Sequence, residues 1–250
     1  MDFVVLDFEF NQPYSFKSGL KTVLNPLCPF EIIQIGAVKL NSDFNELDKL
    51  NIFVRPQIYT RIHPFVERMT GLNIANFENA SFFQEIYPAF AKFVGKDSIL
   101  CTWGIDDIKA LYKNILFYDL DPNIITNKYI NVQKHASYFL KTESGSSIGL
   151  KSAVELLNIP EEVKFHDALN DAAYTAKIFA KTHITTIEPN IFNTDDLNKR
   201  RKRATINKKA LISFFEKDYG RRLTPEECKM IKKAYKLGKN KVFEKSGQNN

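Results

Sequence analysis

Short apolar runs near the start of the chain predict three β-strands. FVVLDFEF, over residues 3–10, is rich in residues that favour β-structure and is interrupted only by two acids. EIIQIGAVKL, over 31–40, predicts a second strand, and IFVRP, over 52–56, predicts a third. Three strands in succession favour an antiparallel meander.

The middle of the chain alternates predicted strands and helices. Apolar residues at helical spacing predict a helix over 81–94, with Ser81 as its N-cap. ILCTW predicts a fourth strand over 99–103. Further helices are predicted over 106–117, 150–157 and 167–181. This order predicts an α/β domain that ends near residue 184.

The remainder of the chain predicts a linker and a helical appendage. Residues 185–204 are polar and include the basic run KRRKR. Beyond them, 206–219 and 224–237 predict two helices, the second with a capping box from Thr224 and Glu227. The predicted organisation is an α/β domain over 1–184, a basic linker over 185–204, and a helical hairpin with a basic tail over 205–250.

Charge is divided unevenly along the 250 residues. From Asp195 to Asn250 there are 17 Lys and Arg against 7 Asp and Glu, a net charge of +10, which leaves −4 of the total +6 for residues 1–194. A basic tail on an acidic body favours a nucleic-acid partner, because Lys and Arg that neutralise phosphates release condensed counterions. A solvated pair of basic helices is the alternative.

Composition excludes several other classes of protein. No run of about 18 apolar residues occurs, so we expect no membrane span and no membrane partner. Cys28, Cys101 and Cys228 lie far apart and have no metal-ligand spacing, which favours a reducing, cytoplasmic location.

Two acids stand inside the first predicted strand. Asp7 and Glu9 are two residues apart, so their side chains leave the same face of the strand and can converge on one cation. Two carboxylates in an apolar strand are costly unless a positive group holds them. Ordinary salt bridges, or an edge strand whose acids face water, are the alternatives.

Three further polar residues have suggestive positions. Asp107 follows the fourth predicted strand and opens a helix, where α/β folds place ligands. Adjacent Asp106 is an alternative, and both acids could simply cap the helix. His166 precedes the alanine-rich helix, and Asp171 lies about one turn inside it, so that both can face one cleft.

In the order DxE, D and HxxxxD, these residues resemble the DEDD, or DnaQ-like, 3′–5′ exonuclease superfamily in its histidine-bearing subgroup. The likeness covers roughly residues 1–183 and includes EIIQIGA at 31–37, TGL at 70–72 and HDALNDA at 166–172. WGIDD at 103–107 resembles the form in the branch of histone-mRNA, small-RNA and sporulation-inhibitor-like exonucleases. That register favours Asp107 over Asp106.

The resemblance implies an RNase H-like mixed sheet flanked by helices, and two Mg²⁺ or Mn²⁺ ions that assist in-line attack of water. Asp7 would bridge both metals, Glu9 and Asp171 would complete the first site, and Asp107 would hold the second. His166 would be the general base. Such an enzyme releases nucleoside 5′-monophosphates.

The same resemblance suggests where a strand would bind. The predicted substrate contacts are Phe10, Asn11, Met69, Thr70 and Leu72, with Arg200, Arg201 and Arg203 as a phosphate clamp. Single-stranded RNA or DNA 3′ ends are the expected partners, with RNA or short oligonucleotides favoured by the branch. A binding module with little turnover, or a polymerase-associated proofreading exonuclease, are the alternative functions. The C-terminal helices could also bind a protein partner, and a monomer or a dimer is expected.

Overall fold

The computed structural model describes residues 1–14, 23–142, 147–182, 187–198 and 208–239. Contacts divide the chain into two compact units. Of the described residues, those up to Asn198 belong to the first unit, and residues 208–239 belong to the second.

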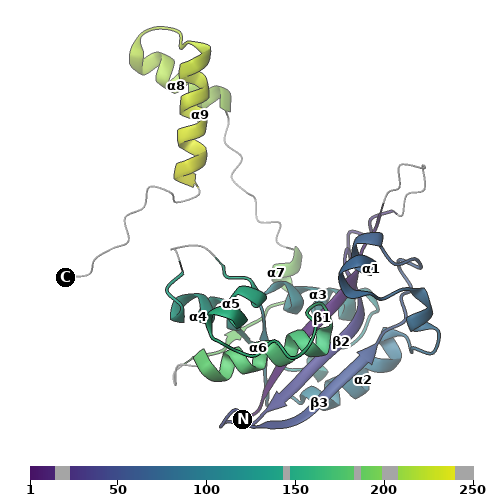
Figure 1. Cartoon of the computed structure of the whole chain (residues 1–250). Helices are drawn as coiled ribbons and strands as arrows, with labels where there is room; N and C mark the ends of the chain where they lie inside the picture. Colours follow the sequence, from purple (N-terminus) through teal and green to yellow (C-terminus); the bar gives the residue numbers. More distant parts are fainter. Residues whose placement is uncertain (15–22, 143–146, 183–186, 199–207, 240–250) are drawn as a thin grey trace. The chain divides into compact units, whose positions relative to one another are not determined.

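The first unit is built on a mixed sheet (Figure 1). Its strands are β1 (Phe3–Asn11), β2 (Glu31–Leu40), β3 (Glu46–Phe53), β4 (Ile99–Thr102), β5 (Lys128–Asn131) and β6 (Asn190–Ile191). They lie in the order β3-β2-β1-β4-β5-β6. The first three form an antiparallel meander, β4 and β5 run parallel to β1, and β6 is antiparallel to β5. The predicted fold class is therefore confirmed.

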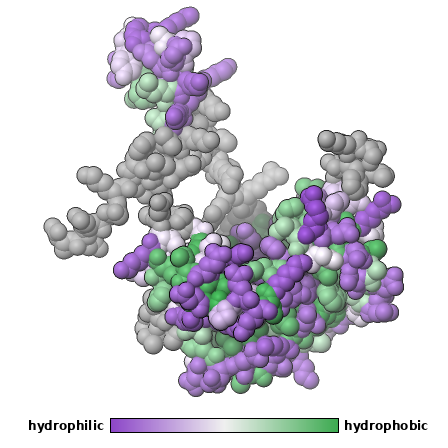
Figure 2. All heavy atoms as spheres, in the orientation of Figure 1, coloured by the Kyte–Doolittle hydropathy of each residue, from purple (hydrophilic) through white to green (hydrophobic). Residues whose placement is uncertain are grey.

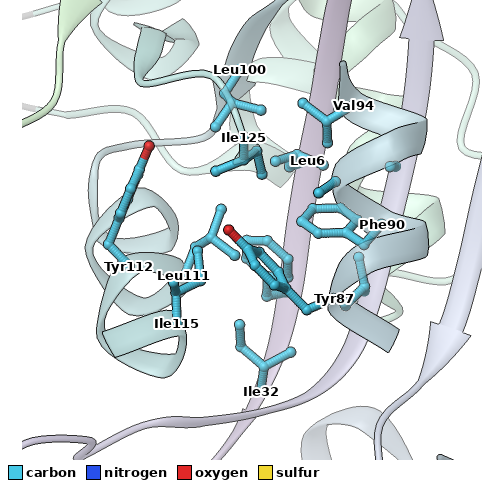
Figure 3. Packing of buried hydrophobic residues seen from close by; sticks show 14 of the residues in the cluster. Leu6, Ile32, Tyr87, Phe90, Val94, Leu100, Leu111, Tyr112, Ile115 and Ile125 are labelled. Atoms are coloured by element: carbon cyan, nitrogen blue, oxygen red, sulfur yellow. The ribbon is translucent and has the colours of Figure 1, made fainter. Parts of the chain in front are cut away.

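Helices cover both faces of this sheet. On one face lie α2 (Phe83–Val94) and α3 (Asp106–Phe117), and on the other lie α4 (Val132–Phe139), α5 (Leu150–Leu156) and α6 (Ala168–Thr182). Side chains alternate along a strand, so Val4 and Leu6 of β1 pack with α2 and α3, whereas Val5 packs with α4, α5 and α6. Figure 3 shows Leu6 among side chains of α2 and α3. Asp7 continues the Val5 face and therefore points to the side of α6.

The predicted elements with strong apolar patterns agree with the structure. β1, β2, β4 and α3 match their predicted bounds to within one residue. The bounds of β3 were predicted wrongly, because this exposed edge strand carries polar residues (ELDKLNIF) that mask its pattern. The N-cap of α2 was also predicted wrongly. It is Phe82, whose N–H donates to Oε2 of Glu85 at 3.0 Å, and not Ser81.

Several short elements were not predicted from the sequence. They are α1 (Pro64–Thr70), η1 (Ile74–Phe77), η2 (Pro122–Ile124), β5, α4, β6 and α7 (Asp195–Asn198). β6 and α7 fall within the stretch interpreted as a linker. Phe192, directly after β6, is buried and stacks on Tyr112 with ring centroids 4.7 Å apart, so the chain is packed onto the first unit there.

The second unit contains α8 (Lys208–Tyr219) and α9 (Pro225–Lys239), which contact each other across a turn at Gly220. The predicted capping box is present: Thr224 N–H donates to Oε2 of Glu227 at 2.8 Å, and Glu227 N–H donates to the Thr224 hydroxyl at 3.3 Å. On the face of this unit shown in Figure 2, hydrophilic residues surround a smaller apolar area. No helix in the described part of the chain combines the length and apolar character needed to cross a bilayer.

Candidate active site

The acids of β1 lie in the part of this strand that extends beyond its parallel neighbour, β4. The last pair between β1 and β4 is Leu6 with Thr102. Asp7 and Glu9 lie beyond it, both half-buried on the α6 side of the sheet. The strand therefore carries two carboxylates to the edge at which α/β folds bind ligands.

A glycine allows α6 to come close to these acids. Gly36 of β2 lies opposite Asp7, and a Cβ on Gly36 would stand 2.0 Å from the Ala168 carbonyl carbon at the start of α6. Glycine in a strand often marks such an approach of another backbone. One turn later, Asp171 meets the acids of β1, so that carboxylate oxygens of Asp7, Glu9 and Asp171 lie within 4.8 Å of one another.

The structure separates the roles of two adjacent acids on α3. Asp106 is exposed and pairs with the Lys109 ammonium at 2.7 Å. Asp107 instead accepts a backbone hydrogen bond from Phe8 of β1, and its charge raises the pKa of Asp7. Asp107 is therefore the α3 acid that joins the cluster, in the register that the resemblance favours.

Burial and the proximity of other carboxylates both disfavour the ionised forms of these acids. Burial, and then neighbouring carboxylates, raise the pKa of Asp7 and raise the pKa of Glu9 to about 8. Burial raises the pKa of Asp107 to about 7 and that of Asp171 to about 6. Within the described residues, the charges that act on Asp7 and Glu9 are all carboxylates.

One buried oxygen supports a metal site directly. Asp171 is only 8% exposed, and its Oδ1 has no hydrogen-bond partner in the described structure. A buried carboxylate oxygen is costly unless a donor or a cation satisfies it. Four converging carboxylates are the hard oxygen ligands that Mg²⁺ and Mn²⁺ prefer, so the residues fit the implied divalent ions.

His166 stands at the rim of the cluster. Its backbone N–H donates to Oδ2 of Asp171 at 3.1 Å, and its backbone is in the left-handed region, with φ of 65°. The residue is exposed. The structure therefore ties the backbone of His166 to a candidate metal ligand and leaves its imidazole open to solvent.

Two positioning residues were missed by the sequence analysis. Gln34 is fully buried in β2, and its Nε2 donates to Oδ2 of Asp167 and to Oδ1 of Asn51, each at 2.9 Å. Oδ1 of Asp167 accepts from the N–H of Asn170 at 3.1 Å, and the Asp167 charge raises the pKa of Asp7 and Glu9. The available signal was a lone polar residue inside the apolar run EIIQIGAV.

Two of the predicted substrate contacts already have partners within the protein. Asn11 is fully buried: its Nδ2 donates to the carbonyls of Tyr59 and Arg61 at 2.8 and 2.9 Å, and its Oδ1 accepts from the N–H of His63 at 3.0 Å. Leu72 is 9% exposed and belongs to a buried apolar cluster. Both side chains hold the segment around α1 in place, because their polar or apolar surface is already used within the protein.

The other predicted substrate contacts differ in how much of each side chain is free to meet a ligand. The hydroxyl of Thr70 donates to the Val66 carbonyl at 2.9 Å and accepts from the N–H of Leu72 at 3.0 Å. Phe10 is half-buried, with its ring centroid 6.2 Å from that of Phe30, and Met69 is half-buried near the end of α1. Arg200, Arg201 and Arg203 lie outside the described residues.

Comparison with known proteins agrees with this geometry. Residues 4–179 match a family model, RNase T, described as "Exonuclease". The PolC-type DNA polymerase III of Caldanaerobacter subterraneus subsp. tengcongensis is 27% identical over 201 residues, which are 79% of this chain and only 13% of the polymerase.

Two solved structures share the fold. The nuclease domain of 3′hExo, a DEDDh family member bound to rAMP, has a TM-score of 0.62 at 22% identity, covering 77% of this chain and 96% of that one. Exonuclease I of E. coli, in complex with a dA16 oligonucleotide, has a TM-score of 0.51 at 15% identity, covering 72% and 40%. Since the family match extends over well more than half of its length, this chain belongs to the RNase T exonuclease family, of the DnaQ-like type.

Proposed function

We propose that the protein is a metal-dependent 3′–5′ exonuclease that acts on single-stranded nucleic acid. One observation carries the proposal: Asp7, Glu9, Asp107 and Asp171 meet in a partly buried cluster whose pKa values are all raised. Burial is the main cause of these raised pKa values, with repulsion between carboxylates second for Asp7 and Glu9, and strongly perturbed pKa values of this kind are common at functional sites.

Each residue has a defined role in this proposal. Asp7, Glu9, Asp107 and Asp171 would hold two Mg²⁺ or Mn²⁺ ions, which when bound neutralise charge that develops on the phosphate and lower the pKa of the attacking water. His166 takes the proton from that water through its exposed imidazole and passes it to solvent. Asp171 also accepts a hydrogen bond from the backbone N–H of His166, which positions the proposed base next to the proposed metal ligands.

Single-stranded RNA is the substrate class we favour, with nucleoside 5′-monophosphates as products. The 3′hExo structure contains rAMP, and its TM-score exceeds that of the exonuclease I complex with DNA. The WGIDD sequence points to the same branch. The match to PolC-type polymerase favours proofreading as the second candidate function.

The proposal predicts a specific cleavage pattern. Purified protein with Mg²⁺ or Mn²⁺ should shorten 5′-labelled RNA from its 3′ end in steps of one nucleotide, and chelator should stop the reaction. DNA of the same sequence should be cut more slowly, whereas faster removal of DNA ends would favour proofreading. Retention of uncut label in a complex would instead indicate a binding module.

We also propose that the second unit adds affinity for the strand. Lys229, Lys232 and Lys233 occupy one exposed stripe of α9 and have no carboxylate partner within the described residues. Exposed Phe214 and Tyr219 of α8 supply aromatic faces on the same unit. Clustered lysines with aromatic rings are typical of surfaces that bind single strands.

Removing residues 199–250 should test that role. The deletion keeps the packed α7 and removes 17 Lys and Arg. We expect affinity for a 20-nucleotide strand to fall by about tenfold or more and its salt dependence to flatten, with hydrolysis of a dinucleotide changed by less than about twofold. An unchanged salt slope would show that the hairpin does not contact the strand and would favour a protein partner.

A further inference from the structure

A hollow of about 530 Å³ lies beside His166. It is lined by Lys151 of α5 and by residues 161–166, the segment that leads into α6. The hollow is shallow and largely open to solvent. The hollow therefore adjoins the acid cluster but is formed by side chains that do not belong to it.

The segment that forms this hollow is fixed to α6. The Tyr174 hydroxyl donates to the carbonyl of Val163 at 2.8 Å and accepts from its N–H at 3.1 Å. The Phe165 ring stacks on Tyr174 with centroids 4.7 Å apart. Nδ2 of Asn170 donates to the carbonyl of Lys164 at 2.9 Å. The backbone around Lys164 is therefore held in place before any ligand binds.

Two of the lysines near the hollow form ion pairs with glutamates, and a third, Lys164, forms none among the described residues. Glu161 lies 3.9 Å from the ammonium of Lys151, and Glu162 lies 2.9 Å from that of Lys177. Lys164 is exposed and has no carboxylate partner in the described part of the chain.

The ammonium of Lys164 reaches toward the segment that follows α1. Its Nζ lies 3.9 Å from the position that a Cβ on Gly71 would take. Gly71 caps the C-terminus of α1, and Asn11 ties the start of that helix to the end of β1. The Lys164 ammonium therefore lies next to the C-terminus of α1, a helix whose other end is joined to the strand that carries Asp7 and Glu9.

We infer that Lys164 binds a phosphate of the substrate strand next to the phosphodiester that is cleaved, and that the adjoining hollow receives the nucleotide at that position. The inference rests on the proposed nuclease function. In this inference, a strand whose terminal linkage lies at the acid cluster brings its next phosphate within reach of Lys164. An unpaired ammonium suits a phosphate oxygen as a point charge, and the contact reads the backbone and not the base.

Kinetics on two substrates test the inference. One substrate is a single-stranded RNA pentamer, and the other is the p-nitrophenyl ester of thymidine 5′-monophosphate, which has only the scissile linkage. Lys164→Gln should raise KM for the pentamer by about tenfold with kcat changed by less than about twofold, and should leave the ester unaffected. Lys164→Arg should restore most of the loss. Lys92→Gln, an exposed change of the same charge on α2, is the matched control.

Binding provides an arm that does not depend on turnover. In an Asp7→Asn background, Lys164→Gln should weaken binding of the labelled pentamer. The slope of log affinity against log salt concentration should become shallower by about one unit, as expected for the loss of one phosphate contact. Equal losses on pentamer and ester, or an unchanged slope, would overturn the inference. Failure of the wild-type protein to cleave either substrate would overturn the nuclease function instead, while the binding arm would still decide the role of Lys164.

Discussion

Replacing Asp7 by Asn should abolish hydrolysis and at the same time stabilise the metal-free protein. Asp7 would hold the ions together with Glu9 and Asp171, whose carboxylate oxygens lie within 4.8 Å of its own. We expect the rate of RNA hydrolysis to fall by at least about 10³-fold, because a neutral amide would bind the divalent ions much more weakly than a carboxylate. A labelled-strand assay with Mg²⁺ measures the loss.

The raised pKa values determine how the stability of the metal-free wild-type protein changes with pH. The folded-state pKa values of the cluster are raised, to about 8 for Glu9 and about 6 for Asp171, so ionisation of these groups opposes folding at high pH. Metal-free wild-type protein should therefore become more stable as the pH falls from about 8 to about 6. The gain ends near pH 4, where carboxyls of the unfolded chain are also protonated.

Thermal unfolding in chelator measures this effect. At pH 8, Asp7→Asn should raise the unfolding midpoint by several degrees, since about 1 kcal/mol moves the midpoint of a protein of this size by about 2–4 °C. Its midpoint should also depend less on pH than that of the wild type. Mg²⁺ should stabilise the wild type more at pH 8 than at pH 6, because the ions bind ionised carboxylates.

Asp106→Asn is the matched control for both measurements. It makes the same chemical change on an exposed acid whose ion pair with Lys109 contributes little to stability. Activity and midpoint should stay close to wild type. Wild-type rates in Asp7→Asn, or a midpoint lowered in chelator at pH 8, would contradict the assignment of the cluster as a metal site.

The sequence predicted the sheet centre and the two acids of β1 because both have local signals. β1 and β2 are apolar runs bounded by turn residues, and within residues 3–10 of β1 only Asp7 and Glu9 break the pattern. Asp107 and Asp171 were grouped with them through family resemblance, and the structure brings all four together. Their catalytic roles, and that of His166, stay predictions.

What the sequence did not predict depends on contacts between distant residues. Gln34 holds Asp167 across 133 positions of chain, and Asn11 holds the segment before α1 across about 50. No periodicity encodes such pairs. The four-residue strand β5 is too short for alternation to identify it. In β3, exposed charged residues interrupt the apolar pattern that would identify a strand.

Gly36→Ala in β2 should disrupt the site by pushing away the start of α6, the helix that carries Asp171. The added Cβ would stand 2.0 Å from the carbonyl carbon of Ala168 and 2.2 Å from the backbone nitrogen of Leu169, and backbone atoms at a helix start cannot rotate away. We expect α6 to shift from β2 and carry Asp171 away from Asp7. The cost should reach or exceed the upper end of the about 1–3 kcal/mol that is usual for overpacking.

Two measurements separate loss of the site from loss of the fold. Circular dichroism gives the folded fraction, and the Mg²⁺-induced shift of the unfolding midpoint reports the site. Gly36→Ala should lose this shift and its activity beyond any loss of folded protein, because displacement of α6 separates the ligands. Gly149→Ala is the control: its Cβ would meet nothing within 4 Å, and its φ of −71° suits alanine. A Gly36→Ala protein with wild-type stability and metal response would show that α6 does not need this close approach to position Asp171.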